Sequence, residues 1–445
     1  MRKLFIMLLA LFVGALPAGS KKVWTLQECL DYALANNITL QQKQVSLEQS
    51  KIDVTVSKAK LLPTVSFSTN QNMAYRPFSQ QTINLTNGTM TTSQSETNYN
   101  GNYGINANWT VWNGGQIQKN IKRNEISKQI ADLATQQTAN SIQEQITQLY
   151  IQILYETEAV RVDSETVKLS ELQRDRGKEM VKVGNMAKVD LAQLESQVTQ
   201  DRYSLVSAQS QLENYKLQLK QLLEIHGEES FDVSTPDVSD GAVLSAIHTR
   251  SNIYETALGL RPEISSGKLN IEASKLDEKI AKAGALPTVT MSAALGSSHS
   301  SGTGIVVGTQ LKNNWSNSIG LTLAVPIFDQ KEVKSAVAKA KLATQNSVLE
   351  LQDTQKQLYS EIENYWLNAT TAQQQYKSAK ANVTSMQESY DLVSEQFRLG
   401  LKNIVELTTG KNNLLSARQQ MLQSKYTALF NLSMLRFYEG QSIKL

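Results

Sequence analysis

Side chains that could carry catalysis or hold a metal are sparse and scattered in this sequence. His226 and His248 have no histidine or cysteine partner at the spacing of a metal site, and Cys29 is the only cysteine. The sequence also lacks a nucleophile elbow and a phosphate-binding loop. We therefore expect no catalytic residue, metal ligand or cofactor, and interpret the two histidines as loop residues and Cys29 as an ordinary helix residue.

Ionisable side chains recur instead at one repeated place in the chain. Residues 397–407 read FRLGLKNIVEL, and residues 181–191 read VKVGNMAKVDL. Gly184 and Gly400 hold the same place in the two runs, 216 residues apart, and each is followed at the same spacing by valine, an acid and leucine. Glycine between long helical stretches suits a residue that leaves the helical conformation and turns the chain. The sequence therefore predicts two halves, each folded about a long helical hairpin.

The overall composition limits the kinds of partner and of membrane segment that the chain could have. The net charge is +3 and 19% of the residues are charged, so nothing favours nucleic acid as a partner. Mean hydropathy is −0.33, and no run of about 18 apolar residues follows the N-terminus, so we expect no membrane-spanning helix. Arg2 and Lys3, the apolar run 4–16 and small residues to Ser20 predict a signal peptide over residues 1–20.

Four stretches show the two-residue period of β-strands, at about residues 63–75, 97–112, 287–296 and 314–326. Such alternation fits a soluble sheet with one buried face. It also fits transmembrane strands, because the stretches are about ten residues long with aromatic residues toward their ends. Four strands cannot close a barrel, and an open edge in lipid would leave backbone groups unpaired, so several chains must pool their strands. The polar stretches 76–96 and 296–314 are then outer loops.

Long helices occupy most of the rest. Thr25 and Glu28 have capping-box spacing at the start of a helix predicted to reach about residue 60. Residues 331–399 contain neither proline nor glycine. They carry apolar residues every three and four positions, which predicts a coiled-coil seam. The segment 227–243 reads as a connecting loop with one short strand. Short helices follow it, and Pro262 is expected at the first position of the second one.

Several of these features together resemble the TolC-like outer-membrane efflux proteins, over about residues 25–440. They are the duplicated halves, the paired turns at Gly184 and Gly400, the Leu-Pro pairs 62–63 and 286–287 before strands, and the run WNGG at 112–115. The resemblance implies a mainly α fold with a membrane β-barrel part. The first repeat covers residues 21–226, the loop 227–243 follows, and the second repeat covers 244–445. Three identical chains would form a twelve-stranded barrel continuous with a periplasmic α-barrel.

The resemblance also implies a function without catalysis. The homotrimer would be a passive exit duct held in outer-membrane lipid and extending into the periplasm. A periplasmic adaptor protein would dock on the helical turns, and an inner-membrane pump would supply the energy. Two alternatives stay open: a periplasmic coiled-coil scaffold or adaptor without a pore, and a channel dedicated to type I protein secretion or metal export.

Residue roles are carried over from the family one at a time. Asp190 matches an acid that pairs across to a basic residue, and Lys402 stands where the family has arginine. Phe397 replaces a hydrogen-bonding tyrosine, Glu406 matches a carboxylate ring facing the pore, and Thr409 falls where a second acidic ring would be. These five residues are the expected pore constriction. Either acid could instead be a solvated residue near a helix N-terminus, where negative charge is favourable anyway.

Apolar residues at the two turns form the second expected site. The resemblance implies that a hairpin of the adaptor docks on them. The alternative is that they simply pack the end of their own hairpin. The residues concerned are Gly184, Met186, Val189, Gly400, Ile404 and Val405.

Overall fold

The structure is a computed structural model. It describes residues 23–75, 77, 82–86, 89–93, 97–227 and 231–444, with the backbone alone described at 82–86 and 89–93. The expected signal peptide, 1–20, lies outside the described residues. None of the described helices has both the length and the apolar character needed to cross a membrane.

The chain divides into two compact units, and each contains residues from both halves of the sequence. Unit 1 comprises Met1–Gln41, Gln137–Arg261 and Gln357–Leu445. Unit 2 comprises Gln42–Gln136 and Pro262–Lys356. The two repeated halves are therefore interleaved within each unit, because the long helices of each half contribute residues to both.

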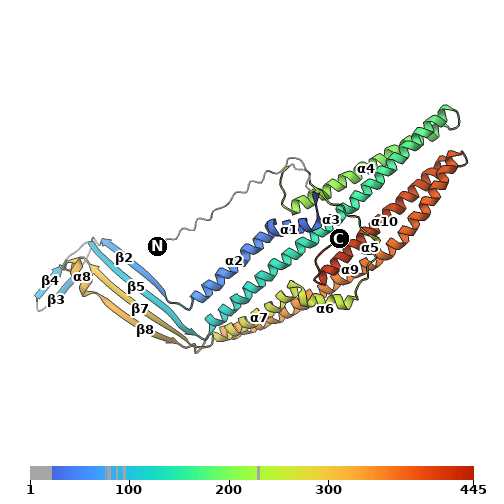
Figure 1. Cartoon of the computed structure of the whole chain (residues 1–445). Coiled ribbons are helices and arrows are strands. Elements are labelled where there is room, and N and C mark those ends of the chain that lie inside the picture. The colour runs from blue at the N-terminus through green and yellow to red at the C-terminus, as the bar shows by residue number, and fades with distance from the viewer. Residues whose placement is uncertain are drawn as a thin grey trace, which may run out of the picture. The chain divides into compact units, whose positions relative to one another are not determined.

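Unit 2 contains a four-stranded sheet (Figure 1). Its strands are β2 (Thr64–Tyr75), β5 (Thr97–Asn113), β7 (Thr288–Ser300) and β8 (Ser316–Ala324), in the order β2-β5-β7-β8. All three pairings are antiparallel, and β5 with β7 joins the first half to the second. The four strands lie at or near the four stretches of two-residue period, with β7 continuing four residues beyond residue 296 and β8 lying within 314–326.

Regular elements occur within the stretches between these strands, where polarity predicted loops. Between β2 and β5, the strands β3 (Thr82–Thr86) and β4 (Thr89–Ser93) pair as an antiparallel hairpin. Between β7 and β8 lies the helix α8 (Val307–Asn313). The buried Gln310 side chain holds this connection together, accepting from the Ser300 amide at 2.8 Å and donating to the Ile305 carbonyl at 2.7 Å.

The predicted helix 25–60 is two helices, α1 (Leu26–Asn36) and α2 (Ile38–Ala59). The expected capping box is present, with Thr25 and Glu28 each bonding to the other's backbone amide. The break occurs at Asn37, which is buried. Its side chain accepts from the Leu40 amide at 3.2 Å and donates to the Leu222 carbonyl at 3.1 Å. Helix periodicity does not reveal this break, because it depends on a residue far away in the sequence.

Two long hairpins follow the predicted design (Figure 1). The first pairs α3 (Gln116–Lys182) with α4 (Lys188–Leu222), and the second pairs α9 (Glu332–Arg398) with α10 (Ile404–Tyr438). Between them in the chain come β6 (Asp232–Val233), α5 (Asp240–Val243), α6 (Arg250–Leu260) and α7 (Pro262–Ala283). Strand β6 is the expected short strand and pairs in parallel with β1 (Val23–Trp24), while Pro262 opens α7 as predicted.

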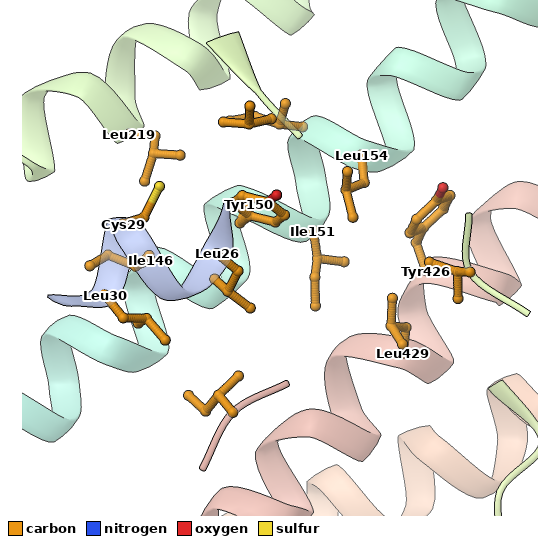
Figure 2. Packing of buried hydrophobic residues seen from close by; sticks show 14 of the residues in the cluster. Leu26, Cys29, Leu30, Ile146, Tyr150, Ile151, Leu154, Leu219, Tyr426 and Leu429 are labelled. Carbon is orange, nitrogen blue, oxygen red and sulfur yellow. The ribbon is translucent and has the colours of Figure 1, made fainter. Parts of the chain in front are cut away.

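The core of unit 1 gathers around the first residues described. Figure 2 shows Leu26, Cys29 and Leu30 of α1 among apolar side chains of α3, α4 and α10. Cys29 is fully buried, which confirms that it is an ordinary helix residue. The hydroxyl of Tyr150 donates to the Ser234 carbonyl at 2.6 Å, and burial raises the pKa of this phenol. The core therefore ties the N-terminal helix to both hairpins.

Candidate functional site

Both hairpin turns have the same backbone design. Gly184 and Gly400 have φ of 78° and 74°, in the left-handed region that favours glycine. The Asn185 amide donates to the Met180 carbonyl at 2.8 Å, and the Leu401 amide donates to the Gln396 carbonyl at 2.9 Å. These bonds five residues back define a Schellman motif at the end of α3 and of α9. The repeated glycines are therefore turn residues, as predicted.

The turns differ at the start of the returning helix. Asn403 caps α10, and Glu406 completes a capping box with its backbone. The ammonium of Lys402, the residue before this cap, forms an ion pair with Glu406 in the first turn of α10. The hydrogen bond that Lys402 donates to Glu406 is the main reason that the pKa of this carboxyl lies below its usual range, and the hydrogen bond from the Asn403 amide adds to the effect. At α4 the cap position is Ala187, which has no capping side chain, and Asp190 lies half-buried in the first turn.

This arrangement bears on two of the expected constriction residues. Glu406 does serve as a helix-capping acid, the simpler of its two interpretations. Within the chain, the ion pair of Lys402 is with Glu406 and not with Asp190. A pair between Lys402 and Asp190 of neighbouring helices in an assembly stays a prediction.

Phe397 and Ile404 pack inside the end of the hairpins. They are 8% and 5% exposed and belong to a cluster drawn from both hairpins. The cluster contains Leu194, Tyr390, Phe397, Ile404, Leu407 and Leu414, with Leu169, Met186 and Met386 against it. Ile404 was expected on an exposed docking patch, and the structure corrects this because its side chain contributes to the interface between hairpins. Met186 is half-buried in the same way.

The exposed apolar surface of the turns is nevertheless larger than the one predicted. Val189 and Val405 are 73% and 57% exposed, as expected for docking residues. Three further apolar residues beside the glycines are also exposed, and the sequence analysis did not select them: Val183 (68%), Leu399 (57%) and Leu401 (72%). Their position next to a predicted turn glycine was the available signal. We call Val183, Val189, Leu399, Leu401 and Val405 the turn patch.

A buried polar cluster lies farther along the hairpins, and sequence reasoning missed it. The Lys411 ammonium of α10 lies 2.5 Å from a carboxylate oxygen of Asp201 on α4 and 2.8 Å from the Ser170 hydroxyl on α3. All three residues are nearly inaccessible to solvent. The available signal was that Lys411 lies between Leu407 and Leu414, on the face of α10 that packs against the other helices.

The sheet has one apolar and one polar face. Residues directly opposite each other share a face, so Phe67, Ile105 and Leu295 lie together, as do Ala293 and Ile319. The apolar face includes Val65, Phe67, Met73, Tyr99, Ile105, Trp109, Met291, Leu295, Ile319, Leu321 and Leu323. The polar face includes Ser66, Ser68, Asn70, Asn102, Asn106, Asn108, Ser292, Ser298, Ser318 and Thr322.

Large apolar side chains of this sheet are exposed. Phe67 is 66% exposed, Ile319 77% and Leu321 72%. In addition, β2 and β8 are the edge strands, each with a strand partner on one side only among the described residues. A soluble sheet would bury its apolar face and protect its edges. This sheet instead has the pattern of barrel strands that face lipid on one side and a polar lumen on the other.

Among the residues that the structure describes, no three or more histidine, cysteine, aspartate or glutamate side chains gather in a way that could hold a metal ion. His248 precedes α6, and its Nδ1 lies 2.6 Å from a carboxylate oxygen of Glu439.

Comparisons with known proteins agree on one family. The model of the family "Outer membrane efflux protein" matches residues 29–224 and 253–441. The outer membrane protein TolC of Escherichia coli (strain K12) is 22% identical over 58% of this chain, and the match spans 53% of that protein. Toxin and drug export protein A of Aggregatibacter actinomycetemcomitans is 19% identical over 91% of this chain and 83% of its own length. The crystal structure of CusC has a TM-score of 0.80 and 14% identity, and the match covers 94% of this chain and 92% of that one.

Proposed function

The chain belongs to the outer membrane efflux protein family, and we propose that it is the outer-membrane channel of a tripartite efflux or secretion system. In this role it is a passive exit duct without catalytic activity, leading from a pump complex in the periplasm to the exterior. The observation that carries the proposal is the amphipathic sheet, whose exposed apolar face and open edges suit a barrel in lipid.

The open edges support a homotrimer. Pooling the four strands of each of three chains closes a twelve-stranded barrel, and β2 of one chain then pairs with β8 of the next. The polar faces line the lumen with serine, threonine and asparagine, which suits passage of many solutes without strong selection. This supports a general duct over a metal-export channel, whose lumen would offer methionine or histidine ligands.

The constriction of the duct is assigned to the second turn. Glu406 supplies a carboxylate from each chain, and Lys402 beside it offsets part of the repulsion among the three. Thr409 is exposed one turn farther along α10 and adds no charge. Phe397 acts from inside the hairpin by holding α9 against the start of α10. The ion pair between Asp190 and Lys402 of neighbouring helices is weaker than a pair between Asp190 and an arginine would be, because lysine lacks a bidentate fork.

The turn patch is assigned to a periplasmic adaptor protein. Its five exposed aliphatic side chains surround Gly184 and Gly400, where the backbone is accessible and a Cβ atom would meet nothing within 4 Å. Apolar side chains on exposed turns suit the helical hairpin of a partner, which would bury them. The adaptor connects the duct to an inner-membrane pump that supplies the energy.

Planar-bilayer conductance of the purified protein tests this proposal, with Glu406→Gln as the variant. Glutamine keeps the capping box, so the substitution changes charge without removing the helix cap. We expect small, cation-preferring current steps in the wild type and a loss of cation preference in the variant. A matched control is Glu179→Gln, which removes an exposed acid near the end of α3.

Native mass measurement in detergent first establishes that the inserted species is a trimer. A trimer that inserts and conducts no ions would leave either a tightly sealed duct or a scaffold or adaptor without a pore. If conductance and cation preference are the same in Glu406→Gln as in the wild type, the constriction lies elsewhere.

A further inference from the structure

The buried cluster of Lys411, Asp201 and Ser170 brings three helices together. Lys411 lies on α10, Asp201 on α4 and Ser170 on α3, so the cluster connects the second hairpin to both helices of the first. The Asp201 carboxylate accepts from three donors: the Lys411 ammonium, the Ser170 hydroxyl and, at 2.8 Å, the Gln197 side-chain amide. Each charge therefore has its partner, although the side chains of Lys411 and Asp201 are only 3% and 6% exposed.

This cluster is absent from the equivalent place in the other half. Counted from Gly184 and Gly400, Ser170 corresponds to Met386, Asp201 to Ala417, and Lys411 to Glu195. Ala417 is buried and Met386 packs partly against the apolar cluster at the turns. The chain thus has apolar side chains where the duplicated half has a hydroxyl and a carboxylate. The ion pair belongs to one hairpin interface rather than to the hairpin design.

A buried ion pair is a poor source of net stability. Removing two charges from water is costly, and their mutual attraction only roughly offsets that cost, whereas removing one partner of such a pair leaves a buried charge unpaired. What the pair does provide is geometry, because α10 cannot slide or rotate on α3 and α4 without leaving a charge buried alone. Burial lowers the pKa of Lys411, and its hydrogen bond to Asp201 opposes this.

We propose that Lys411, Asp201 and Ser170 form a latch that fixes α10 on the first hairpin and so holds the two turns of one chain in a single arrangement. Its consequence for gating rests on the proposed channel function: any opening that moves one hairpin relative to the other must first break the latch. The latch lies within one chain, and it is separate from the expected Lys402–Asp190 contact at the turns. The three residues are positioning residues that line no pore.

The distance between the two turns tests the latch directly. Spin labels on cysteines introduced at Val183 and Leu401 report one position on each turn, and both sites are exposed. The native Cys29 is buried and stays unlabelled. Labelled chain is diluted with unlabelled chain, so that each assembly contains one labelled pair. We expect a narrow distance distribution in the wild type and a broader one, shifted to longer distances, in Lys411→Met.

Charge exchange separates a latch from simple core packing. Lys411→Asp combined with Asp201→Lys restores an ion pair and should restore the narrow distribution. Lys182→Met is the matched control, because it removes a lysine from an exposed pair near the same turn and should change nothing. If Lys411→Met does not fold, Ser170→Ala replaces it, removing only the hydroxyl that bonds to both charges.

Two outcomes would overturn the latch. The first is an unchanged distribution in Lys411→Met and Ser170→Ala despite a lower melting temperature, which would make the cluster a packing feature only. The second is equal broadening in the charge-exchanged chain. Failure of the proposed function is distinguishable, because a wild-type protein that conducts no ions would still give a distance distribution that decides the latch.

Discussion

Two lysine–carboxylate pairs, one at the start of α10 and one between α10 and α4, illustrate how environment decides what a pair of charges does. In the pair Lys402–Glu406 the side chains are 38% and 40% exposed, and in the pair Lys411–Asp201 they are 3% and 6% exposed. Exposed pairs contribute little to stability because water screens them. The first pair therefore sets the charge at the turn, while the second, shielded from water and shared between hairpins, restrains their relative position.

Asp163 is a third buried ionisable side chain in the same region, and the effect of its burial on stability can be measured. Burial, and then the nearby charge of Asp201, raise the pKa of this carboxyl, while a hydrogen bond from Gln419 opposes the rise. At pH values between 3.8 and the raised pKa, Asp163 therefore holds a proton in the folded chain that it has released in the unfolded chain. The free energy of unfolding accordingly falls as pH rises from 3.8 through the raised pKa.

We expect Asp163→Asn to raise the melting temperature at pH 7, because asparagine has no charge to bury, and to change it little below pH 3.8, where the carboxyl is protonated in the folded and the unfolded chain alike. Thermal unfolding followed by circular dichroism at both pH values checks this. Asp132→Asn, at an exposed position on the same helix, is the control and should show no such difference. An equal gain at both pH values would contradict the electrostatic explanation.

Among the elements, the hairpins show how a short local pattern determines a large structure. Each consists of a helix of 67 residues and a helix of 35, joined at a glycine with positive φ. Gly410 lies only ten residues after Gly400, yet it sits inside α10 with helical neighbours. A Cβ atom there would lie 3.7 Å from the Tyr390 ring, an ordinary contact.

The same substitution should therefore have opposite effects at these two glycines. Gly400→Ala forces a left-handed conformation on alanine and should cost roughly 1–2 kcal/mol of unfolding free energy. Gly410→Ala should gain roughly 0.5–1 kcal/mol, because glycine weakens a helix interior. Chemical unfolding of both variants measures the difference. If both substitutions changed the free energy of unfolding in the same direction, the left-handed conformation would not be the reason for glycine at position 400.

For the molecule as a whole, the sheet is the part that a single chain leaves incomplete. Its edge strands β2 and β8 each have one strand partner among the residues described, and its apolar face is exposed. Lipid and neighbouring chains would satisfy both features at once, because lipid covers apolar side chains and strand pairing satisfies the backbone groups of the edges. We therefore expect this part of the protein to fold fully only as an assembly in a membrane.

Charged substitutions on the two faces of β8 test this arrangement. Ile319→Lys places a charge on the lipid-facing side and should cost about 2–4 kcal/mol near the middle of the bilayer. Ser318→Lys, one residue earlier on the polar face, should insert like the wild type. Folding yield into lipid vesicles, read as the fraction of protein that resists added protease, gives the comparison. Equal tolerance of both lysines would argue against a lipid-facing sheet.

The sequence by itself determined the elements and the family, because both depend on local signals. Residue periods of two and of three to four separate strands from helices, and Gly184 and Gly400 mark turns whose backbone only glycine adopts easily. The resemblance drawn from these motifs agrees with the family match along the chain. The exposure of Val189 and Val405 also followed, because they lie beside a turn.

Only the tertiary structure decided which side chains meet. Lys411 contacts Ser170 across 241 residues of sequence and Asp201 across 210, and the Asn37 side chain bonds to a carbonyl 185 residues away. Such contacts depend on how each long helix is rotated and shifted against its neighbours. A heptad pattern leaves several of those arrangements open. For the same reason Ile404 proved buried and Lys402 turned to Glu406, and both outcomes were set by packing around the turns.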